Sequence, residues 1–541
     1  MSVGETGISL MVLNENLLSY KTTINENHNV SAVAGLSYQY DQTEYNGGSG
    51  ENSPSDQIYY VRPGFPDLGD EQLTPSLSRK IALQHYLSDM TEQVLISYFT
   101  RLEYNYKKKY LFSASIRRDG SSTFGEGNRW ANFPSVALGW AFSDEPFIKR
   151  FTEGWLNWGK IRASYGTSGQ TFTSAYLAYG MMKVDGYSSF MGNMPIAPES
   201  PISRDLTWEE TEQYDLGLDL DMFDYRLNVK LDYYYKYTKS LIYDVRLPAA
   251  LYLYRSRTEN AMEVSNEGIE LELTADILRD GPVSWRSKLN LSKNWNRFEK
   301  SYSGKDISGL IIGRPLYAMY VAAFDGYYES EDEIARVYKT NGKEYFFPGS
   351  VPASSGVSDL VGFYKYKDFN GDGRVDQYYA GSPLPVSYGG WVNEVMWKNF
   401  DLNVLFNFSF GRKMINARRT SLNKVGPKFV DYKDLHYWTG PGCKANLPRL
   451  GELASVYNDA NIEKVNSMSL KQITLGYTLP DKIARKAGFS GVRVFATGEN
   501  LFFWSNYSGS NPEVVDVYSG MDDGNDYPLP RKWTLGLTLN F

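Results

Sequence analysis

Residues 368–376 read DFNGDGRVD, and the spacing of their acidic and amide side chains is that of a calcium-binding loop. In helix–loop–helix calcium sites, oxygen ligands occupy loop positions 1, 3, 5, 7, 9 and 12, with glycine at position 6. This stretch supplies oxygen atoms at positions 1, 3, 5 and 9 and the glycine at position 6. The candidate calcium ligands are Asp368, Asn370, Asp372 and Asp376.

The sequence around this loop excludes a helix–loop–helix site. Position 12 is Tyr379, where a bidentate glutamate would be needed, and Pro383 and Pro385 prevent a helix from following. A calcium-binding loop of another kind is one interpretation, because calcium is abundant outside cells and a weak site would suffice there. A tight turn that satisfies its own backbone is the alternative, since Asn-Gly-Asp-Gly is also strong turn chemistry.

The sequence offers little other chemistry. The three histidines, His28, His85 and His436, share no metal-ligand spacing, and the single cysteine, Cys443, excludes a disulfide framework. Residues 154–161, GWLNWGKI, fit the start of a phosphate-binding loop, but isoleucine stands where a serine or threonine must bind the metal. We therefore expect no catalytic residue, no enzyme activity and no required cofactor. A net charge of −7 without basic blocks argues against a nucleic-acid partner.

Strict alternation of apolar and polar residues is the dominant pattern of the chain. In residues 400–410, phenylalanine, leucine and valine at even positions face aspartate, asparagine and serine at most odd positions, and 214–222 and 227–237 show the same period. These runs have about ten residues or more, whereas soluble strands have about 5–6. Strands of about 9–11 residues with one apolar face are typical of outer-membrane barrels.

Counting such runs predicts roughly fifteen strands, with ISLMVL (8–13) as one more. Short turns alternate with long Gly-, Ser-, Pro- and Asp-rich loops, which is the pattern of a barrel with long extracellular loops. The predicted strands lie near 15–24, 29–40, 93–106, 110–118, 133–142, 155–166, 207–222, 226–239, 266–277, 283–296, 386–397, 400–411, 465–478, 491–504 and 531–541. The predicted long loops cover 41–92, 119–132, 167–206, 240–265, 297–385, 412–464 and 505–530.

The chain ends on RKWTLGLTLNF, an alternating strand with a terminal phenylalanine, which looks like the sorting signal of outer-membrane barrels. Together with further segments, this end resembles the SusC/RagA-like TonB-dependent outer-membrane transporters of Bacteroidetes-type bacteria. Those segments are YLFSASIRRDGSSTFGEGNRWANFPSVALGWAFSDEPF (110–147), KIRASYGTSGQ (160–170), LTWEETEQYDLGLDLDMFDYRLNVKLDYYYKYTKSLI (206–242), NEGIELEL (266–273), DFNGDGRVD (368–376), GENLFFWSNYSGSNPEV (498–514) and YPLPRKWTLGLTLNF (527–541).

The resemblance implies an all-β fold, a transmembrane antiparallel β-barrel of which residues 1–541 form the C-terminal part. About 15–16 strands would be present of the roughly 22 found in plugged transporters. It also implies an N-terminal plug domain and a TonB-contacting segment, both expected before Met1 and lost from this chain. A SusD-like surface lipoprotein, outer-membrane lipid and an oligosaccharide or peptide cargo are the implied partners, and the cell outer membrane is the implied location.

Two other functions fit parts of the pattern. A non-transporting outer-membrane receptor or adhesin, or a truncated barrel fragment without function, would show the same strands. A soluble β-sandwich or β-propeller that binds or cuts glycans is disfavoured by the strand lengths.

Aromatic residues in the long loops could stack on sugar rings or pack within the loops, and no cargo-binding residue is assigned among them. They include Tyr327, Tyr328, Tyr345, Trp438 and Tyr457.

Overall fold

The computed structural model describes most of the chain, and almost all of its regular structure is strand. Among the residues that the structure describes, we find no helix with the length and apolar character that crossing a membrane would require. The described residues are 2–50, 84–171, 175–180, 182–184, 196–198, 201–248, 254–307, 309–338, 344–347, 351–352, 356–421, 435–451, 458–524 and 527–541.

Within this part of the chain, sixteen strands hydrogen-bond into one sheet, in which fifteen follow each other in sequence order and β24 (Met521–Asp522) lies beside β21. The fifteen are β1 Ser2–Ile24, β2 His28–Gly50, β3 Gln84–Tyr106, β4 Tyr110–Ser121, β5 Trp130–Trp140, β6 Leu156–Gln170, β9 Glu209–Met222, β10 Leu227–Arg246, β11 Ser256–Leu278, β12 Val283–Lys300, β20 Ser387–Trp397, β21 Phe400–Asn416, β22 Ile462–Thr478, β23 Gly491–Ser505 and β25 Lys532–Asn540. Neighbours from β1 to β5 and from β12 to β25 pair antiparallel. The all-β prediction and the sequence-order strand connections are confirmed.

Several predicted boundaries are wrong because the strands are longer than their apolar pattern. The expected loop over 41–92 is cut at both ends, since β2 continues to Gly50 and β3 begins at Gln84. ISLMVL is not an additional strand, because β1 runs unbroken from Ser2 to Ile24 through it. Backbone hydrogen bonds continue a ladder wherever the neighbouring strand continues, whatever side chains the residues carry.

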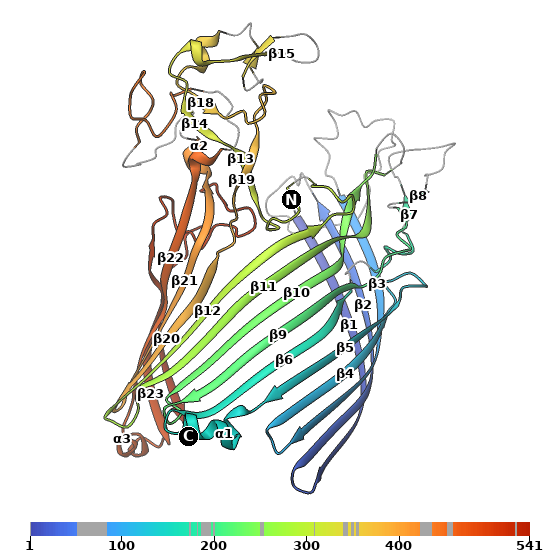
Figure 1. Cartoon of the computed structure of the whole chain (residues 1–541), viewed down its shortest axis with the longest axis vertical. Helices are drawn as coiled ribbons and strands as arrows, with labels where there is room; N and C mark the ends of the chain where they lie inside the picture. The colour runs from blue at the N-terminus through green and yellow to red at the C-terminus, as the bar shows by residue number, and fades with distance from the viewer. Residues whose placement is uncertain are drawn as a thin grey trace. The chain divides into compact units, whose positions relative to one another are not determined.

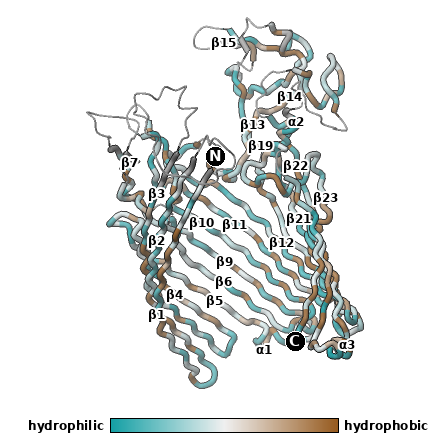
Figure 2. The backbone as a smooth tube through the Cα atoms, turned by 180° about the vertical axis from the view of Figure 1, so that it is seen from behind, coloured by the Kyte–Doolittle hydropathy of each residue, from teal (hydrophilic) through white to brown (hydrophobic). Residues whose placement is uncertain are grey.

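The register sorts side chains onto one apolar and one polar face. Leu402, Val404 and Phe406 of β21 share a face with their cross-strand partners, and the residues between them face the other way. On β25, Trp533, Leu535 and Leu537 share one face, and Leu535 is 85% exposed. Figure 2 shows the alternation as teal and brown changing residue by residue along the strands. An apolar face this exposed needs an apolar surrounding to be stable.

The described contacts divide the chain into two compact units. Unit 1 comprises 1–141, 162–215 and 236–263, and its buried core lies where the loop after β4 folds against residues 206–208. Phe124 is fully buried there, and the rings of Phe124 and Phe133 pack on Trp208 with centroids 5.0 and 5.5 Å away. The short strands β7 (Met182–Val184) and β8 (Ile196–Pro198), also in unit 1, pair with each other.

Unit 2 comprises 142–161, 216–235 and 264–541, and it contains the short turns at 223–226, 279–282 and 398–399 and the long connections from β12 to β20 and from β21 to β22. Helix α1 (Pro146–Thr152) precedes β6, and α3 (Asp481–Lys486) connects β22 to β23. Beyond the ends of β21 and β22 lie small two- and three-stranded sheets (Figure 1), which are β13 Met319–Ala322 with β19 Gln377–Gly381, β14 Phe324–Tyr327 with β18 Tyr364–Tyr366, and β15 Arg336–Tyr338 with β16 Glu344–Phe346 and β17 Val351–Pro352.

These small sheets, which we call the outer module, are joined to the long strands by one buried cluster, and a second cluster packs within the module itself. Helix α2 (Ala417–Ser421) directly follows β21. Ile415 of β21 packs with Met319 and Val321 of β13, and Asp459 accepts hydrogen bonds from the Phe324 backbone N–H (2.7 Å) and the Tyr378 hydroxyl (2.5 Å). Bonding to this carboxylate raises the pKa of Tyr378 to about 12. The outer module is therefore held on the strand ends by packing and polar contacts.

Candidate functional site

The polar face of unit 2 is crossed by ion pairs between neighbouring strands. Lys230 of β10 binds Glu272 of β11 (3.1 Å), and Lys288 of β12 binds Glu394 of β20 (3.0 Å). All four side chains are about half exposed, so each pair adds little stability by itself. Their effect is to make this face hydrophilic, which suits a surface that contacts water and polar solutes rather than lipid.

One ion pair spans three strands above a glycine. Arg493 of β23 donates through Nε and Nη2 to both carboxylate oxygens of Asp401 on β21, at 3.0 and 2.5 Å. Gly476 of β22 lies beneath the pair, and a Cβ there would be 2.4 Å from Asp401 Oδ1 and 2.6 Å from Arg493 Nη2. Glycine at this position therefore allows the bidentate contact to form across the intervening strand.

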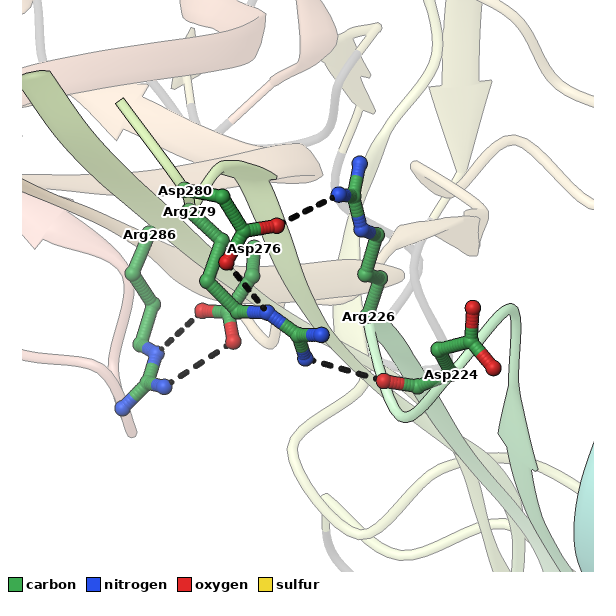
Figure 3. Close-up of polar contacts among 6 residues, drawn as sticks. All are labelled: Asp224, Arg226, Asp276, Arg279, Asp280 and Arg286. Atoms are coloured by element: carbon green, nitrogen blue, oxygen red, sulfur yellow. Dashed lines mark hydrogen bonds and ion pairs between the residues drawn. The ribbon is translucent and has the colours of Figure 1, made fainter.

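A second group of charges ties the short turns together (Figure 3). Arg226 binds Asp280 (2.9 Å), Arg286 forms a bidentate pair with Asp276 (2.6 and 3.0 Å), and Arg279 donates to the backbone carbonyl of Asp224 (2.9 Å). Three consecutive strands, β10, β11 and β12, are thereby linked at the turn end. This turn cluster is structural, because each of its arginines has a described partner.

Two cavities open in unit 2. The first, of about 650 Å³, lies on the polar face and is lined by residues of β11, β12, β20, β21 and β22 together with Glu513. The second, of about 760 Å³, lies between β12, β21 and the segment 379–388, with Trp295, Tyr379 and Tyr388 among its lining residues. Both volumes are in the range of small-molecule sites.

The candidate calcium loop lies between β18 and β19 without flanking helices, as the sequence predicted. Its acidic side chains accept hydrogen bonds from the loop's own backbone: Asp368 from Gly371 (2.7 Å) and Gly373 (2.9 Å), and Asp376 from Phe369 (2.6 Å). Asn370 Oδ1 accepts a hydrogen bond from the backbone N–H of Asp372 (2.8 Å), and Asp372 Oδ1 accepts one from that of Arg374 (2.9 Å). In the described part of the chain, no three His, Cys, Asp or Glu side chains gather at a distance suited to a metal. This arrangement fits the turn interpretation, and the calcium site stays a prediction.

The loop should lose order in acid. The N–H groups of Gly373 and Gly371 hold the pKa of Asp368 below its ordinary value, so the charged form stabilises the loop above about pH 4. This contribution disappears as the pH falls through the lowered pKa. We expect hydrogen exchange, corrected for intrinsic rate, to show protected amides at Gly371 and Gly373 at pH 7 and a progressive loss of protection as the pH falls below about 4.

Two variants check this expectation. Asp368→Ala should remove the protection at every pH, whereas Asp332→Ala, at an exposed carboxylate of the outer module, should leave the profile unchanged. Protection in the unmodified chain that does not decrease at all as the pH falls below about 4 would contradict the assignment. Addition of millimolar calcium in the same experiment tests the metal prediction, because a bound ion would raise protection further only when Asp368 is present.

The loop aromatics mostly pack within the outer module. Tyr328 is 2% exposed, and burial raises its pKa to about 12. The ring of Tyr327 packs on Tyr364 (5.8 Å between centroids), and burial raises its pKa also. Tyr345 lies in β16, and the ring of Trp438 is next to Gly362. Tyr457 lies outside the described residues.

The remaining candidates are far apart. His28 contacts the Tyr104 hydroxyl through Nδ1 (2.8 Å), His85 lies in β3, and His436 lies in the loop before β22. Cys443 Sγ accepts a bond from the Thr439 backbone N–H (3.4 Å), which lowers the pKa of the thiol. The lysine of GWLNWGKI lies within β6 rather than at the start of a helix, so that stretch is no phosphate loop.

The protein-family model described as "TonB dependent receptor-like, beta-barrel" matches residues 8–411 of this chain. The chain belongs to this family. The SusC/RagA-like barrel inferred from the motifs is confirmed by this match and by the relatives that follow, so the apolar face of this TonB-dependent receptor barrel is its lipid face and the polar face lines its lumen.

Relatives of this TonB-dependent receptor barrel include two curated proteins. TonB-dependent receptor P26 of Formosa agariphila is 30% identical over 98% of this chain and 53% of its own length. TonB-dependent receptor SusC of Bacteroides thetaiotaomicron is 28% identical over 83% of this chain and 44% of its own length. The chain therefore spans about half the length of the curated relatives it matches.

A solved structure of the RagAB peptide transporter has the same fold. It matches 100% of this chain and 56% of its own chain, with a TM-score of 0.79 and 22% identity. The fold of this TonB-dependent receptor barrel thus agrees with that of a solved structure. These relatives are transporters or receptors rather than enzymes.

Proposed function

We propose that this chain forms the barrel wall of an outer-membrane TonB-dependent importer of oligosaccharides or peptides that works with a SusD-like surface lipoprotein. Residues 1–541 would belong to one β-barrel domain in the outer membrane of a Bacteroidetes-type bacterium. The family match over residues 8–411 carries the proposal. The RagAB peptide transporter, among the relatives, supports a peptide cargo, and both SusC and RagAB support the kind of partner.

The wall would contribute binding and passage rather than covalent chemistry. Ion pairs such as Lys288–Glu394 and amide side chains such as Asn407 make its lumen face hydrophilic. Polar cargo can exchange hydrogen bonds with such a wall as it moves. The outer module would carry the surface that receives cargo from the lipoprotein. Energy would come from TonB.

Growth on single nutrients tests this proposal. Deleting the gene in its native host should abolish growth on one class of oligosaccharide or peptide, while growth on the corresponding monomers is unchanged. Depleting TonB should give the same result, because passage requires energy. Restoring the gene should restore growth.

The same experiment separates importer from adhesin. If deletion leaves every growth rate unchanged but removes binding of labelled cargo to the cell surface, the chain is a receptor without transport. The importer is supported if the deletion strain, which still has TonB, fails to grow on the oligosaccharide or peptide but grows normally on the corresponding monomers. Growth that is independent of both the gene and TonB on every nutrient would refute it.

A further inference from the structure

Helix α1 carries two phenylalanine side chains that the described chain leaves largely uncovered. Phe147 is 59% and Phe151 is 83% exposed, and because four residues separate them, they lie on the same side of the helix. The side that packs on the protein carries Ile148 and Thr152, which are half-buried. Isolated exposed apolar residues are ordinary on a protein surface, but neighbouring exposed rings indicate a contact with something apolar.

The exposed aromatic residues continue from α1 into the adjoining turn, at the turn end of the sheet (Figure 1). Trp155 is exposed, and its indole N–H donates a hydrogen bond to the Phe151 carbonyl (3.3 Å). The Trp155 carbonyl accepts one from the backbone N–H of Phe223 (2.8 Å), in the turn between β9 and β10. Phe223 and Tyr225 of that turn are exposed as well. Aromatic side chains from two connections are thus gathered beside α1.

The segment that leads into α1 lies on the apolar face of the sheet. A Cβ at Gly159 of β6 would be 2.5 Å from the Cζ atom of Phe142, so this ring covers the face to which position 159 points. Ile161 points to the same face and is exposed, whereas Lys160 points to the opposite face. The first residue of α1, Pro146, is four positions after Phe142 and therefore lies within about 14 Å of it along the chain. The helix begins at the edge of the lipid face.

The composition of α1 suits the boundary between lipid and water. At about 100° of rotation per residue, Arg150 lies next to the two phenylalanines and Lys149 lies on the side away from them. Both basic side chains are exposed. In interfacial helices, aromatic rings enter the boundary of the acyl chains while lysine or arginine reaches the headgroups. Short turns of outer-membrane barrels face the periplasm, so the nearby leaflet is the periplasmic one.

We propose that α1 is an interfacial anchor that inserts Phe147 and Phe151 into the periplasmic leaflet of the outer membrane. Its partner is the phospholipid surface, with the two rings at the acyl boundary and Arg150 at the phosphate groups. The anchor fixes the depth at which the connection between β5 and β6 lies in the bilayer. This role requires the lipid face alone and goes beyond the proposed import of cargo.

Spin labels on the chain in phospholipid vesicles test the proposal. One label is attached at Phe147→Cys, Phe151→Cys or Lys149→Cys in a Cys443→Ser background, and its collision rates with oxygen and with a water-soluble nickel complex are measured. Because oxygen concentrates in lipid, the ratio of oxygen to nickel accessibility should be higher at positions 147 and 151 than at position 149. Equal ratios at the three positions would overturn the proposal. Low accessibility of positions 147 and 151 to both reagents would also overturn it, since protein would then cover the helix.

Stability in the bilayer gives an independent measurement. Phe151→Ser should raise the equilibrium constant for urea unfolding in vesicles about ten-fold or more, because the transfer of an aromatic side chain into lipid is lost. Lys149→Ser is the matched control, since it places the same residue in the same helix on the side away from lipid. It should change the constant by less than about two-fold. Equal changes in the two variants would contradict the anchor.

The density of protein in the vesicles separates lipid from a second copy of the chain as the partner of α1. If the rings contact another copy, the effect of Phe151→Ser should grow with the number of chains per vesicle, and the proposal fails. An effect that is independent of this number supports lipid. The growth experiments do not involve α1, so the importer function stands even if the labels on α1 report water.

Discussion

Arginine in place of Leu535 is expected to lower the free energy of unfolding in a bilayer by about 2–4 kcal/mol. Leu535 lies near the middle of β25, on the apolar face, with its side chain 85% exposed. A charge there would contact hydrocarbon. Reversible urea unfolding of the chain in lipid vesicles, followed by tryptophan fluorescence, gives the difference.

Thr534→Arg is the matched control for this substitution. Thr534 is the preceding residue, is also exposed, and points to the polar face opposite Thr497. Because arginine is added to the same strand at nearly the same depth, the overall charge changes equally in both variants. Thr534→Arg should cost less than about 1 kcal/mol. Similar losses in the two variants would mean that the face assignment is incorrect.

Gly476→Ala should destabilise the sheet by about 1–3 kcal/mol, the usual cost of overpacking. Its new methyl group would meet both charged groups of the Asp401–Arg493 pair at distances that no relaxed contact shows. The pair is one-third exposed on both sides, so its own contribution is modest and the steric term dominates. The same unfolding experiment measures the loss.

Two further variants show whether the pair causes this loss. In an Asp401→Ala background the methyl group of Gly476→Ala has space, so the added cost should fall to a few tenths of a kcal/mol. Gly7→Ala in β1 has only one atom within 4 Å, at 3.8 Å, and should change stability by less than about 0.5 kcal/mol. An equal cost of Gly476→Ala with and without Asp401 would contradict the three-strand clamp.

The sequence predicted the existence of the strands better than their ends. Alternation identifies residues 400–410 as a strand because lipid and water impose the period-two pattern there. Beyond the apolar band no such pattern is imposed, so β2 could not be followed to Gly50 or β3 back to Gln84. Those ends are held by backbone pairing, which leaves no signature in side-chain type.

In the candidate site, too, the sequence revealed contacts between residues that are near in the chain and missed contacts between distant ones. The turn at 368–376 was recognisable because its hydrogen bonds join residues a few positions apart, such as Asp368 and Gly371. Arg412, which lines the first cavity, carries no such signal, because the backbone carbonyls to which its guanidinium donates lie 29 and 100 residues away. The Asp401–Arg493 pair, 92 residues apart, is equally invisible until the register is known.

The central claim is that, between positions 400 and 409 of β21, the even-numbered residues face lipid and the odd-numbered ones face the aqueous lumen. Spin labels placed one at a time at positions 400–410, in a Cys443→Ser background in vesicles, test it through their collision rates with oxygen and with a water-soluble nickel complex. We predict that oxygen accessibility peaks at 402, 404, 406 and 408 and nickel accessibility at 403, 405 and 407. Accessibility without a two-residue period, or with the two reagents exchanged, would contradict the account.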